Sequence, residues 1–343
     1  MAIYRLPGEK AIKVVAQKKS KLTGGTKKNA ESRGFILAPF STDSSGPKIL
    51  IQPDIFTTAD KLPEFSFAPL KKEEVVSYKH PKIKQAGRHE YIAYVKKIQE
   101  EIKEGQFKKV VAARVTKKKK PSDFEPVDFL EKLCQKYPAA FVSLVYTQQH
   151  GLWIGATPEI LLKVDSGTFT TYSLAGTKAN TPQNAKTDWG NKEKEEQQIV
   201  SEYITGAFKK ATPAKPKITG PETIAAGNLL HLRTTFNYKA PHKIWPLVVS
   251  QLHPTPAVAG LPKKQSIQFI VDHEKADRSY YSGYLGPVNL DNQINLFVNL
   301  RCMQVLKNKL AIHVGCGITI NSKPSAEWKE SKMKTETLLS VLK

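Results

Sequence analysis

The chain has 343 residues and a formal charge of +22, from 53 Lys and Arg against 31 Asp and Glu. Hydrophobic residues make up 40% and aromatic residues 9% of the chain, an ordinary globular composition that excludes wholesale disorder. The charge admits a nucleic-acid-binding protein, but the lysines lie in short scattered groups, so we favour a lysine-rich solvated surface and no nucleic-acid partner.

In chain order, the predicted elements begin with an irregular segment at 1–85, rich in turn formers, which we interpret as short strands and loops. Apolar residues at three- and four-residue spacing then predict a helix at 89–103. A buried strand at 109–115 and a second helix at 127–136 follow. Further strands are predicted at 141–146, 152–156, 160–164 and 168–173.

The second half of the chain repeats this style. Apolar spacing predicts a long helix at 191–209 and a final helix from 325 to the C-terminus. Between them, strands are predicted at 266–271, 280–286, 294–304 and 310–320. Blocks of strands separated by helices, with little regular βαβ alternation, indicate an α+β fold with large antiparallel sheets. Because no linker-like segment or internal repeat divides the chain, we expect one domain over 1–343.

The three cysteines, Cys134, Cys302 and Cys316, have no metal-type spacing, so we expect thiols in a reducing compartment. The N-terminal residues lack the charged-then-apolar pattern of a signal peptide. No stretch approaches the roughly 20 apolar residues of a membrane helix. We therefore expect a soluble, cytoplasmic protein with no membrane partner.

Five ionisable residues stand where the local pattern favours burial: Lys109, Glu159, Glu196, Glu330 and Lys334. Lys109 opens an apolar strand, Glu159 precedes one, and the other three lie on the apolar stripes of predicted helices. Each could be an ordinary surface charge, and Glu330 with Lys334 an ordinary helix salt bridge. Together they indicate a functional cleft, because a buried charge is costly unless it is paired, metal-bound or neutralised.

Glycines end or interrupt two predicted strands, in Leu174-Ala-Gly-Thr177 and Gly315-Cys-Gly317. Either segment could be a simple turn or bulge. A glycine at such a place also lets the backbone approach another group closely and leaves amides that can bind an anion.

These residue types predict a small carboxylate-bearing substrate held through magnesium. Glu196 and Glu330 are suitable hard-oxygen ligands for Mg²⁺. Lys109 and Glu159 could divide the work of base and acid, since an apolar setting favours the protonated form of a glutamate. Arg301, on an apolar strand, is a candidate clamp for the anionic substrate.

Ten segments of the chain, covering roughly 90–343, resemble the chorismate-utilising enzymes, the family of isochorismate, salicylate, anthranilate and aminodeoxychorismate synthases. They occur in the family's order, whereas 1–85 matches poorly and forms a variable N-terminal part. The segments are Lys109-Val-Val-Ala-Ala-Arg114, Thr157-Pro-Glu-Ile-Leu-Leu162, Leu174-Ala-Gly-Thr177, Lys192-Glu-Lys-Glu-Glu-Gln197, Leu230-His-Leu-Arg-Thr234, Leu252-His-Pro-Thr-Pro-Ala-Val-Ala-Gly260, Arg278-Ser-Tyr-Tyr-Ser-Gly283, Leu300-Arg-Cys302, Gly315-Cys-Gly-Ile318 and Glu327-Trp-Lys-Glu330 with Lys334.

The resemblance implies an α+β sandwich of two antiparallel sheets with helices outside. Within the family, the segment His253-Pro-Thr-Pro-Ala-Val and the lysine at Lys109 resemble isochorismate synthases, whose base activates water. The implied activity is the Mg²⁺-dependent, reversible conversion of chorismate into isochorismate, for menaquinone or siderophore synthesis. The alternatives are a salicylate synthase, which also eliminates pyruvate, and, in another class, a basic nucleic-acid-binding protein.

The resemblance also assigns roles. Lys109 is the general base that takes a proton from water, and Glu159 is the general acid that protonates the departing C4 hydroxyl. Glu196 and Glu330 hold Mg²⁺. The implied substrate-binding residues are Gly176, Thr177, Tyr281, Arg301, Gly315, Gly317 and Lys334.

Four positions depart from the family pattern: Gln197 stands for a common His, Glu193 for a common Asp, Cys316 for a common Ala and Ala259 for a frequent Gly. None removes a proposed ligand, acid or base, but Gln197 and Cys316 could alter the geometry around the site. His231 and His253 are expected to form structural hydrogen bonds rather than to bind metal. We expect a monomer without an amidotransferase subunit.

Overall fold

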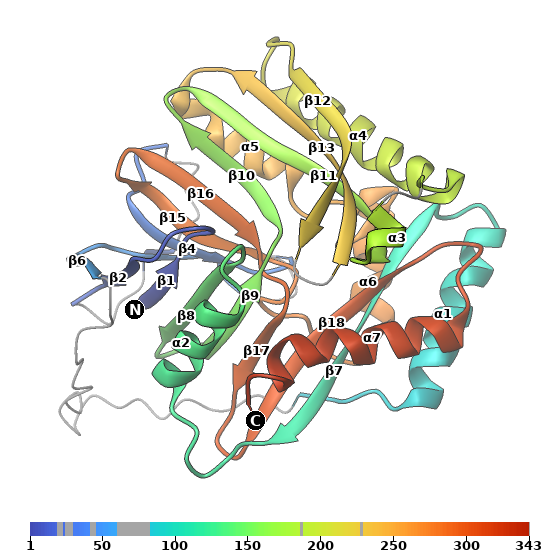
Figure 1. The fold of residues 1–343 in the computed structure, drawn as a ribbon, viewed down its shortest axis with the longest axis horizontal. Coiled ribbons are helices and arrows are strands. Elements are labelled where there is room, and N and C mark those ends of the chain that lie inside the picture. The colour runs from blue at the N-terminus through green and yellow to red at the C-terminus, as the bar shows by residue number, and fades with distance from the viewer. Residues whose placement is uncertain are drawn as a thin grey trace.

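The computed structural model describes residues 1–18, 23–24, 30–41, 46–59, 83–185, 188–226 and 229–342. Only the backbone is described for Thr23, Gly24, Ala175, Thr177, Ala185, Lys192, Glu196, Ala226 and Leu229. Two antiparallel sheets dominate this part of the chain, as the sequence predicts (Figure 1). In this part of the chain no helix is long and apolar enough to cross a membrane.

The first sheet holds the strand that begins with Lys109. Its order is β14-β7-β18-β17-β9-β8-β1-β2-β6, and its pairings are antiparallel. The strands are β1 (Ala2–Arg5), β2 (Ile12–Ala16), β6 (Ile55–Ala59), β7 (Lys109–Lys119), β8 (Phe141–Thr147), β9 (Gly151–Thr157), β14 (Gly260–Leu261), β17 (Cys302–Val305) and β18 (Lys309–Ile318).

The second sheet has the order β12-β13-β11-β10-β16-β15-β4-β5-β3 and is also antiparallel. Its strands are β3 (Thr23–Gly24), β4 (Gly34–Ala38), β5 (Ile49–Ile51), β10 (Ile160–Asp165), β11 (Thr168–Ala179), β12 (Lys217–Ala226), β13 (Leu229–Lys239), β15 (Tyr284–Leu290) and β16 (Gln293–Val298). Both sheets therefore combine strands from the first 60 residues with strands from the rest of the chain.

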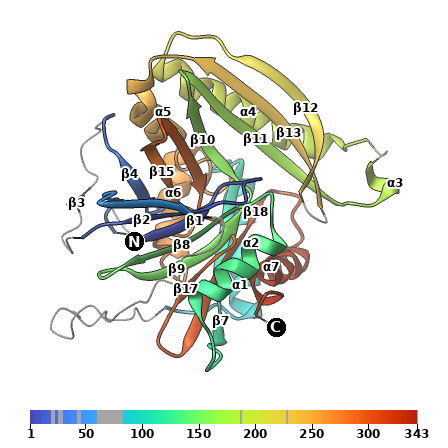
Figure 2. The ribbon, with the colours of Figure 1, turned by 60° about the vertical axis from the view of Figure 1, so that its left-hand side comes forward.

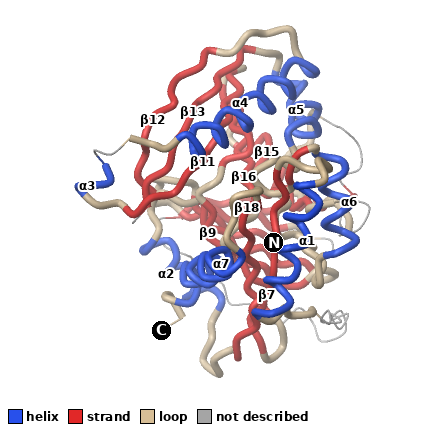
Figure 3. Tube along the Cα trace, turned by 90° about the vertical axis from the view of Figure 1, so that its right-hand side faces the viewer, coloured by secondary structure: helices blue, strands red, loops and turns tan. Residues whose placement is uncertain are grey.

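Helices cover the outer faces of the two sheets (Figures 2 and 3). The described helices are α1 (Arg88–Lys103), α2 (Pro126–Lys136), α3 (Pro182–Ala185), α4 (Asn191–Ala211), η2 (His242–Ile244), α5 (Trp245–Leu252), α6 (Lys263–His273) and α7 (Pro324–Leu339). On the first sheet, α1 contacts β7 and β18, α7 contacts β18, and α2 contacts β8 and β9. On the second sheet, α4 contacts β11 and β13.

A core of aromatic residues lies between the sheets and joins them. Tyr4 and Phe141 from the first sheet pack with Phe35 and Phe297 from the second. The rings of Phe141 and Phe297 stack with centroids 4.1 Å apart. Alternation along each strand sends these side chains inward and leaves the other face to the helices, which is the sandwich that the family resemblance implies.

The structure corrects several element boundaries. The predicted strand at 266–271 is wrong, because these residues lie in α6, where Ser266, Phe269 and Ile270 are buried at helical spacing. The predicted strand at 294–304 is interrupted between β16 and β17, and the strand predicted at 280–286 begins at Tyr284. The strands β12 and β13 and the helix α5 were not predicted.

A buried ion pair joins α6 to the first sheet. Arg278 Nε donates to Glu274 Oε2 at 2.7 Å, and its Nη atoms donate to the carbonyls of Val258 and Val111 at 2.7 and 2.8 Å. The other oxygen of Glu274 accepts from the Ala113 amide at 2.8 Å. Both side chains are almost fully buried, and their hydrogen bonds satisfy backbone groups on the outer edge of β7 that no described strand pairs with.

We expect Arg278→Met to destabilise the fold by about 3–5 kcal/mol, because it leaves the Glu274 carboxylate buried without its partner. The matched control is Arg233→Met, which breaks a half-exposed ion pair with Glu222 and should cost about 1 kcal/mol or less. Urea unfolding followed by circular dichroism measures both. Equal losses in the two variants would contradict the role of the buried pair.

Candidate active site

A cavity of about 330 Å³ lies between β7 and β18 of the first sheet and β11 and β13 of the second. It is lined by nine of the residues that the sequence singles out: Lys109, Glu159, Gly176, Tyr281, Arg301, Gly315, Gly317, Glu330 and Lys334. The side chains of the other two, Thr177 and Glu196, lie outside the described residues. The structure thus places these nine residues around one space.

Lys109 reaches the cavity across a glycine of the neighbouring strand. Val110 pairs with Ile318 and Val111 with Gly317, so the start of β7 lies beside the end of β18. A methyl group on Gly317 would stand 2.7 Å from Lys109 Cε and 3.2 Å from its Nζ. Only a glycine leaves room for this lysine side chain to lie flat against β18.

Glu159 lies in the connection from β9 to β10, where its backbone is fixed at both groups. Its amide donates to Thr157 Oγ1 at 3.3 Å, and its carbonyl accepts from the Val298 amide at 2.9 Å. Burial raises the pKa of Glu159 to about 6, against the opposing charges of Lys109, Arg301 and Lys334. Near neutral pH, this carboxyl can therefore exchange a proton with a bound molecule.

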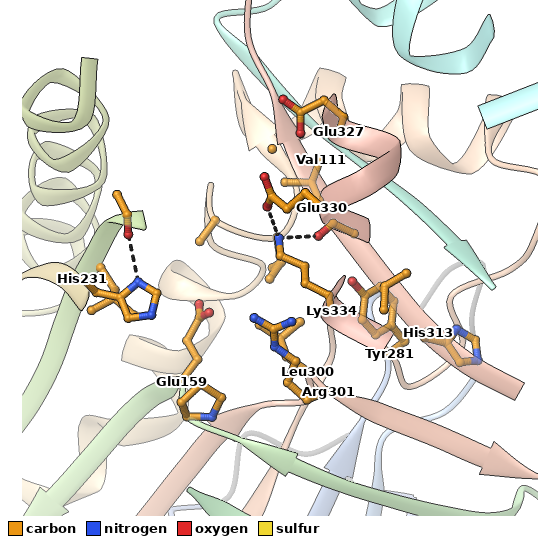
Figure 4. Close-up of a pocket in the computed structure, with 18 of the residues that line it drawn as sticks. Val111, Glu159, His231, Tyr281, Leu300, Arg301, His313, Glu327, Glu330 and Lys334 are labelled. Atoms are coloured by element: carbon orange, nitrogen blue, oxygen red, sulfur yellow. Dashed lines mark hydrogen bonds and ion pairs between the residues drawn. The ribbon is translucent and has the colours of Figure 1, made fainter. Parts of the chain in front are cut away.

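Arg301 enters the cavity from a break between β16 and β17. Its φ of 48° is in the left-handed region, a strained conformation for a non-glycine residue. Figure 4 shows its guanidinium and the Glu159 carboxylate directed toward the centre of the cavity. The sequence predicts a continuous strand here, so it identifies the residue but not the turn that points it inward.

Tyr281 forms part of the wall beside Arg301. It is 3% exposed, and its hydroxyl would stand 2.8 Å from a methyl group on Gly315. The ring stacks on His313, with centroids 5.4 Å apart, and burial lowers the pKa of that histidine to about 3. A neutral imidazole therefore supports the tyrosine. The sequence does not single out His313, whose position inside a strand gives no signal.

Lys334 and Glu330 face the cavity from α7. Lys334 Nζ donates to Glu330 Oε1 at 2.7 Å and to the Gly315 carbonyl at 2.9 Å (Figure 4). Although burial opposes its charge, Lys334 and Arg301 lower the pKa of Glu330. The sequence left open that Glu330 and Lys334 form an ordinary helix salt bridge. They do form an ion pair, and both residues also line the cavity.

Gly176 occupies a bulge where the register between β11 and β13 shifts. Its φ of 66° is left-handed, and a methyl group on it would stand 2.6 Å from the Trp189 ring.

His231 Nδ1 lies 2.8 Å from the Gly176 carbonyl, and His253 Nε2 lies 3.3 Å from the Pro39 carbonyl. Both histidines thus contact backbone carbonyls, as the sequence analysis expects.

Carboxylates on two helices provide donors for a cation. Glu193 on α4 lines the cavity, as do Glu327 and Glu330 on α7. Carboxylate oxygens suit a hard cation such as Mg²⁺, so the described residues fit a metal of this kind. Glu193 and Glu327 were missed as site residues, although each lies three positions before a predicted ligand on the same helix face.

Gln197 holds α4 against the second sheet. This side chain is 3% exposed, and its Nε2 contacts the Ser173 carbonyl at 3.0 Å and Thr234 Oγ1 at 2.9 Å. It thereby joins α4 to β11 and β13 one turn after Glu193. The glutamine that departs from the family pattern therefore fixes the helix that carries the acidic residues.

Residues 47–343 match a family model described as chorismate binding enzyme. Isochorismate synthase EntC of Escherichia coli K12 is 28% identical over 244 residues, which are 69% of this chain and 62% of that protein. The match therefore spans less than two thirds of that relative's length.

Two solved structures have the same fold. MenF, the menaquinone-specific isochorismate synthase of Escherichia coli, aligns with a TM-score of 0.81 at 21% identity, over 100% of this chain and 88% of that chain. Anthranilate synthase component I of Streptococcus pneumoniae aligns with a TM-score of 0.70 at 16% identity, over 94% of this chain and 82% of that chain.

We expect the Glu159 carboxyl to titrate near pH 6, which infrared difference spectra between the wild type and Glu159→Gln can follow. In Arg301→Leu, the midpoint should move to higher pH, because one of the opposing positive charges is lost. A midpoint at the ordinary value of 4.5, or a shift to lower pH in Arg301→Leu, would contradict this electrostatic account.

Proposed function

The chain belongs to the family of chorismate-binding enzymes, and on that premise we propose that it is a magnesium-dependent isochorismate synthase. The observation that carries the proposal is that Lys109 and Glu159, from separate parts of the chain, line one cavity together with two cationic side chains. The name of the relative EntC supports the same activity.

In the proposed reaction, the unprotonated amine of Lys109 accepts a proton from a water molecule as that water forms a bond to C2 of chorismate. The ring double bond shifts, and the C4–oxygen bond breaks. Glu159 donates its proton to the departing hydroxyl, which leaves as water. One water enters and one leaves, so the reaction is reversible and needs no redox partner. A carboxyl whose pKa is about 6 suits both directions.

The anionic groups of chorismate require cationic partners. We assign the enolpyruvyl side to Arg301 and Tyr281, and a carboxylate to Lys334 and the amides near Gly176 and Gly315. These groups surround the cavity, where partial burial strengthens their attraction for an anion. Binding would hold the ring with C2 toward Lys109 and C4 toward Glu159.

We include magnesium in this proposal as a partner of the ring carboxylate, in addition to the protein's own cationic and amide groups. Glu330 and Glu196 would hold the ion, with Glu193 and Glu327 on the same helices as further carboxylate donors. The bound ion would supply positive charge that neutralises the carboxylate and fixes its orientation. Gln197, which anchors α4, would keep the α4 donors in place.

We expect the protein to convert chorismate into isochorismate in the presence of Mg²⁺, and Lys109→Ala to lower kcat at least about 100-fold by removing the base. Chorismate binding should change little. Chromatography identifies the product, and calorimetry measures binding. The matched control is Lys108→Ala, which removes the exposed neighbouring lysine and should keep full turnover.

Other results have definite meanings. Salicylate and pyruvate as products would replace the proposal with a salicylate synthase. Unchanged chorismate would overturn both activities. Normal turnover in Lys109→Ala would remove this lysine from the mechanism.

Gly317→Ala should also impair turnover, because the new methyl group displaces Lys109 from its place against β18. We expect kcat to fall at least about tenfold with a smaller change in KM, as a misplaced catalytic group acts on the chemical step. Gly206→Ala on α4 is the control, since its methyl group would meet nothing within 4 Å. Equal kcat values in the two variants would refute this positioning.

A further inference from the structure

The strand β18 presents different residues to its two sides. Gly315 and Gly317 line the cavity, whereas Cys316 points to the opposite side and packs with Tyr91 and Trp328 beneath α1 and α7. Its Sγ lies 3.5 Å from the Glu327 carbonyl and 3.9 Å from Lys334 Nζ. The thiol is 1% exposed, so it lies directly under the helix that carries the cavity carboxylates.

Glu327 and Glu330 lie at the boundary between these two sides. Both line the cavity, and Figure 4 shows them next to each other on α7. Cys316 Sγ and one carboxylate oxygen from each glutamate lie within 4.8 Å of one another. Two carboxylates that line the cavity thus lie within 4.8 Å of one sulfur atom behind it.

We propose that Cys316, Glu327 and Glu330 form a binding site for a thiophilic divalent cation such as Zn²⁺, which competes with magnesium for Glu330. This inference rests on the proposed function only for its effect on turnover. The binding site itself follows from the three donor atoms.

The donor set explains the selectivity. Mg²⁺ takes oxygen ligands and avoids sulfur, whereas Zn²⁺ and Cd²⁺ bind cysteine sulfur together with carboxylate oxygen. Small movements of the two side chains convert the present spacing into tetrahedral coordination, with water as the fourth ligand. Binding breaks the S–H bond of Cys316 and releases its proton to solvent, while a sulfur electron pair forms the bond to the metal. No electron transfer is required.

The site is coupled to the cavity through α7. One oxygen of Glu330 accepts from Lys334, and a cation bound at Cys316 would hold the Glu330 carboxylate toward the helix side of β18. Glu330 would then no longer be available as a magnesium ligand in the cavity. A thiophilic cation should therefore inhibit competitively with Mg²⁺, and Cys316→Ala should weaken that inhibition.

Cadmium titration of the full chain tests the site, because a cadmium–thiolate bond has its own ultraviolet charge-transfer absorption. The wild type should develop this absorption with one equivalent of Cd²⁺ bound through Cys316, and Cys316→Ala should lack that component. Cys302→Ala is the matched control, since it removes another buried thiol that packs with the aromatic core between the sheets. Cys316→Ser retains the side-chain volume if the alanine variant is unstable.

Turnover gives the second measurement. The concentration of Zn²⁺ or Cd²⁺ that halves activity should rise at least about tenfold in Cys316→Ala, equivalent to about 1.4 kcal/mol of lost binding. It should also rise in the wild type when Mg²⁺ is increased. The proposed site would be refuted if the thiolate absorption were undiminished in both Cys316→Ala and Cys316→Ser, or if the wild type lacked it. Failure of the proposed activity would leave the absorption result unaffected, so the two hypotheses fail separately.

Discussion

The register between β7 and β18 is the constraint on which the site depends. Their pairs run from Val110 with Ile318 to Lys119 with Lys309, the full length of β18. This register places Lys109 over Gly317. Because side chains alternate along a strand, a slip of one residue would turn the lysine toward α1 and α7. The ion pair of Arg278 and Glu274 holds the other edge of β7, so the strand is fixed on both sides.

Burial and positive charge act against each other around Glu159. Burial favours the protonated carboxyl, whereas Lys109, Arg301 and Lys334 favour the carboxylate, and the balance sets the pKa at about 6. In the proposed reaction, the same cations would attract the anionic substrate. The cations that act on Glu159 are those that the fold holds inside the cavity. Changes that alter substrate affinity through them should also alter the proton affinity of the acid.

Much of the site could be predicted from the sequence, because charged residues inside apolar segments need a partner. Lys109, Glu159, Glu330 and Lys334 were found in this way. The turn at Arg301 could not be predicted, since its neighbours form a continuous apolar run. It depends on distant groups: Asn299 Nδ2 donates to the Tyr280 carbonyl, and its own carbonyl accepts from the Ser282 amide. The helix α6 was mistaken for a strand for a similar reason, because a short run rich in apolar residues suits either structure until its packing decides.

The pairing of the N-terminal strands determines when the protein can complete its fold. Ala38 of β4 pairs with Tyr284 of β15, and Leu144 of β8 with Ile3 of β1. At synthesis rates of about 5–20 residues per second, the roughly 250 residues between β4 and β15 take on the order of 10–50 s to appear. During this interval the apolar residues of β4 have no partner from β15. The nascent chain must therefore protect an aggregation-prone edge, and this demand comes from topology rather than catalysis.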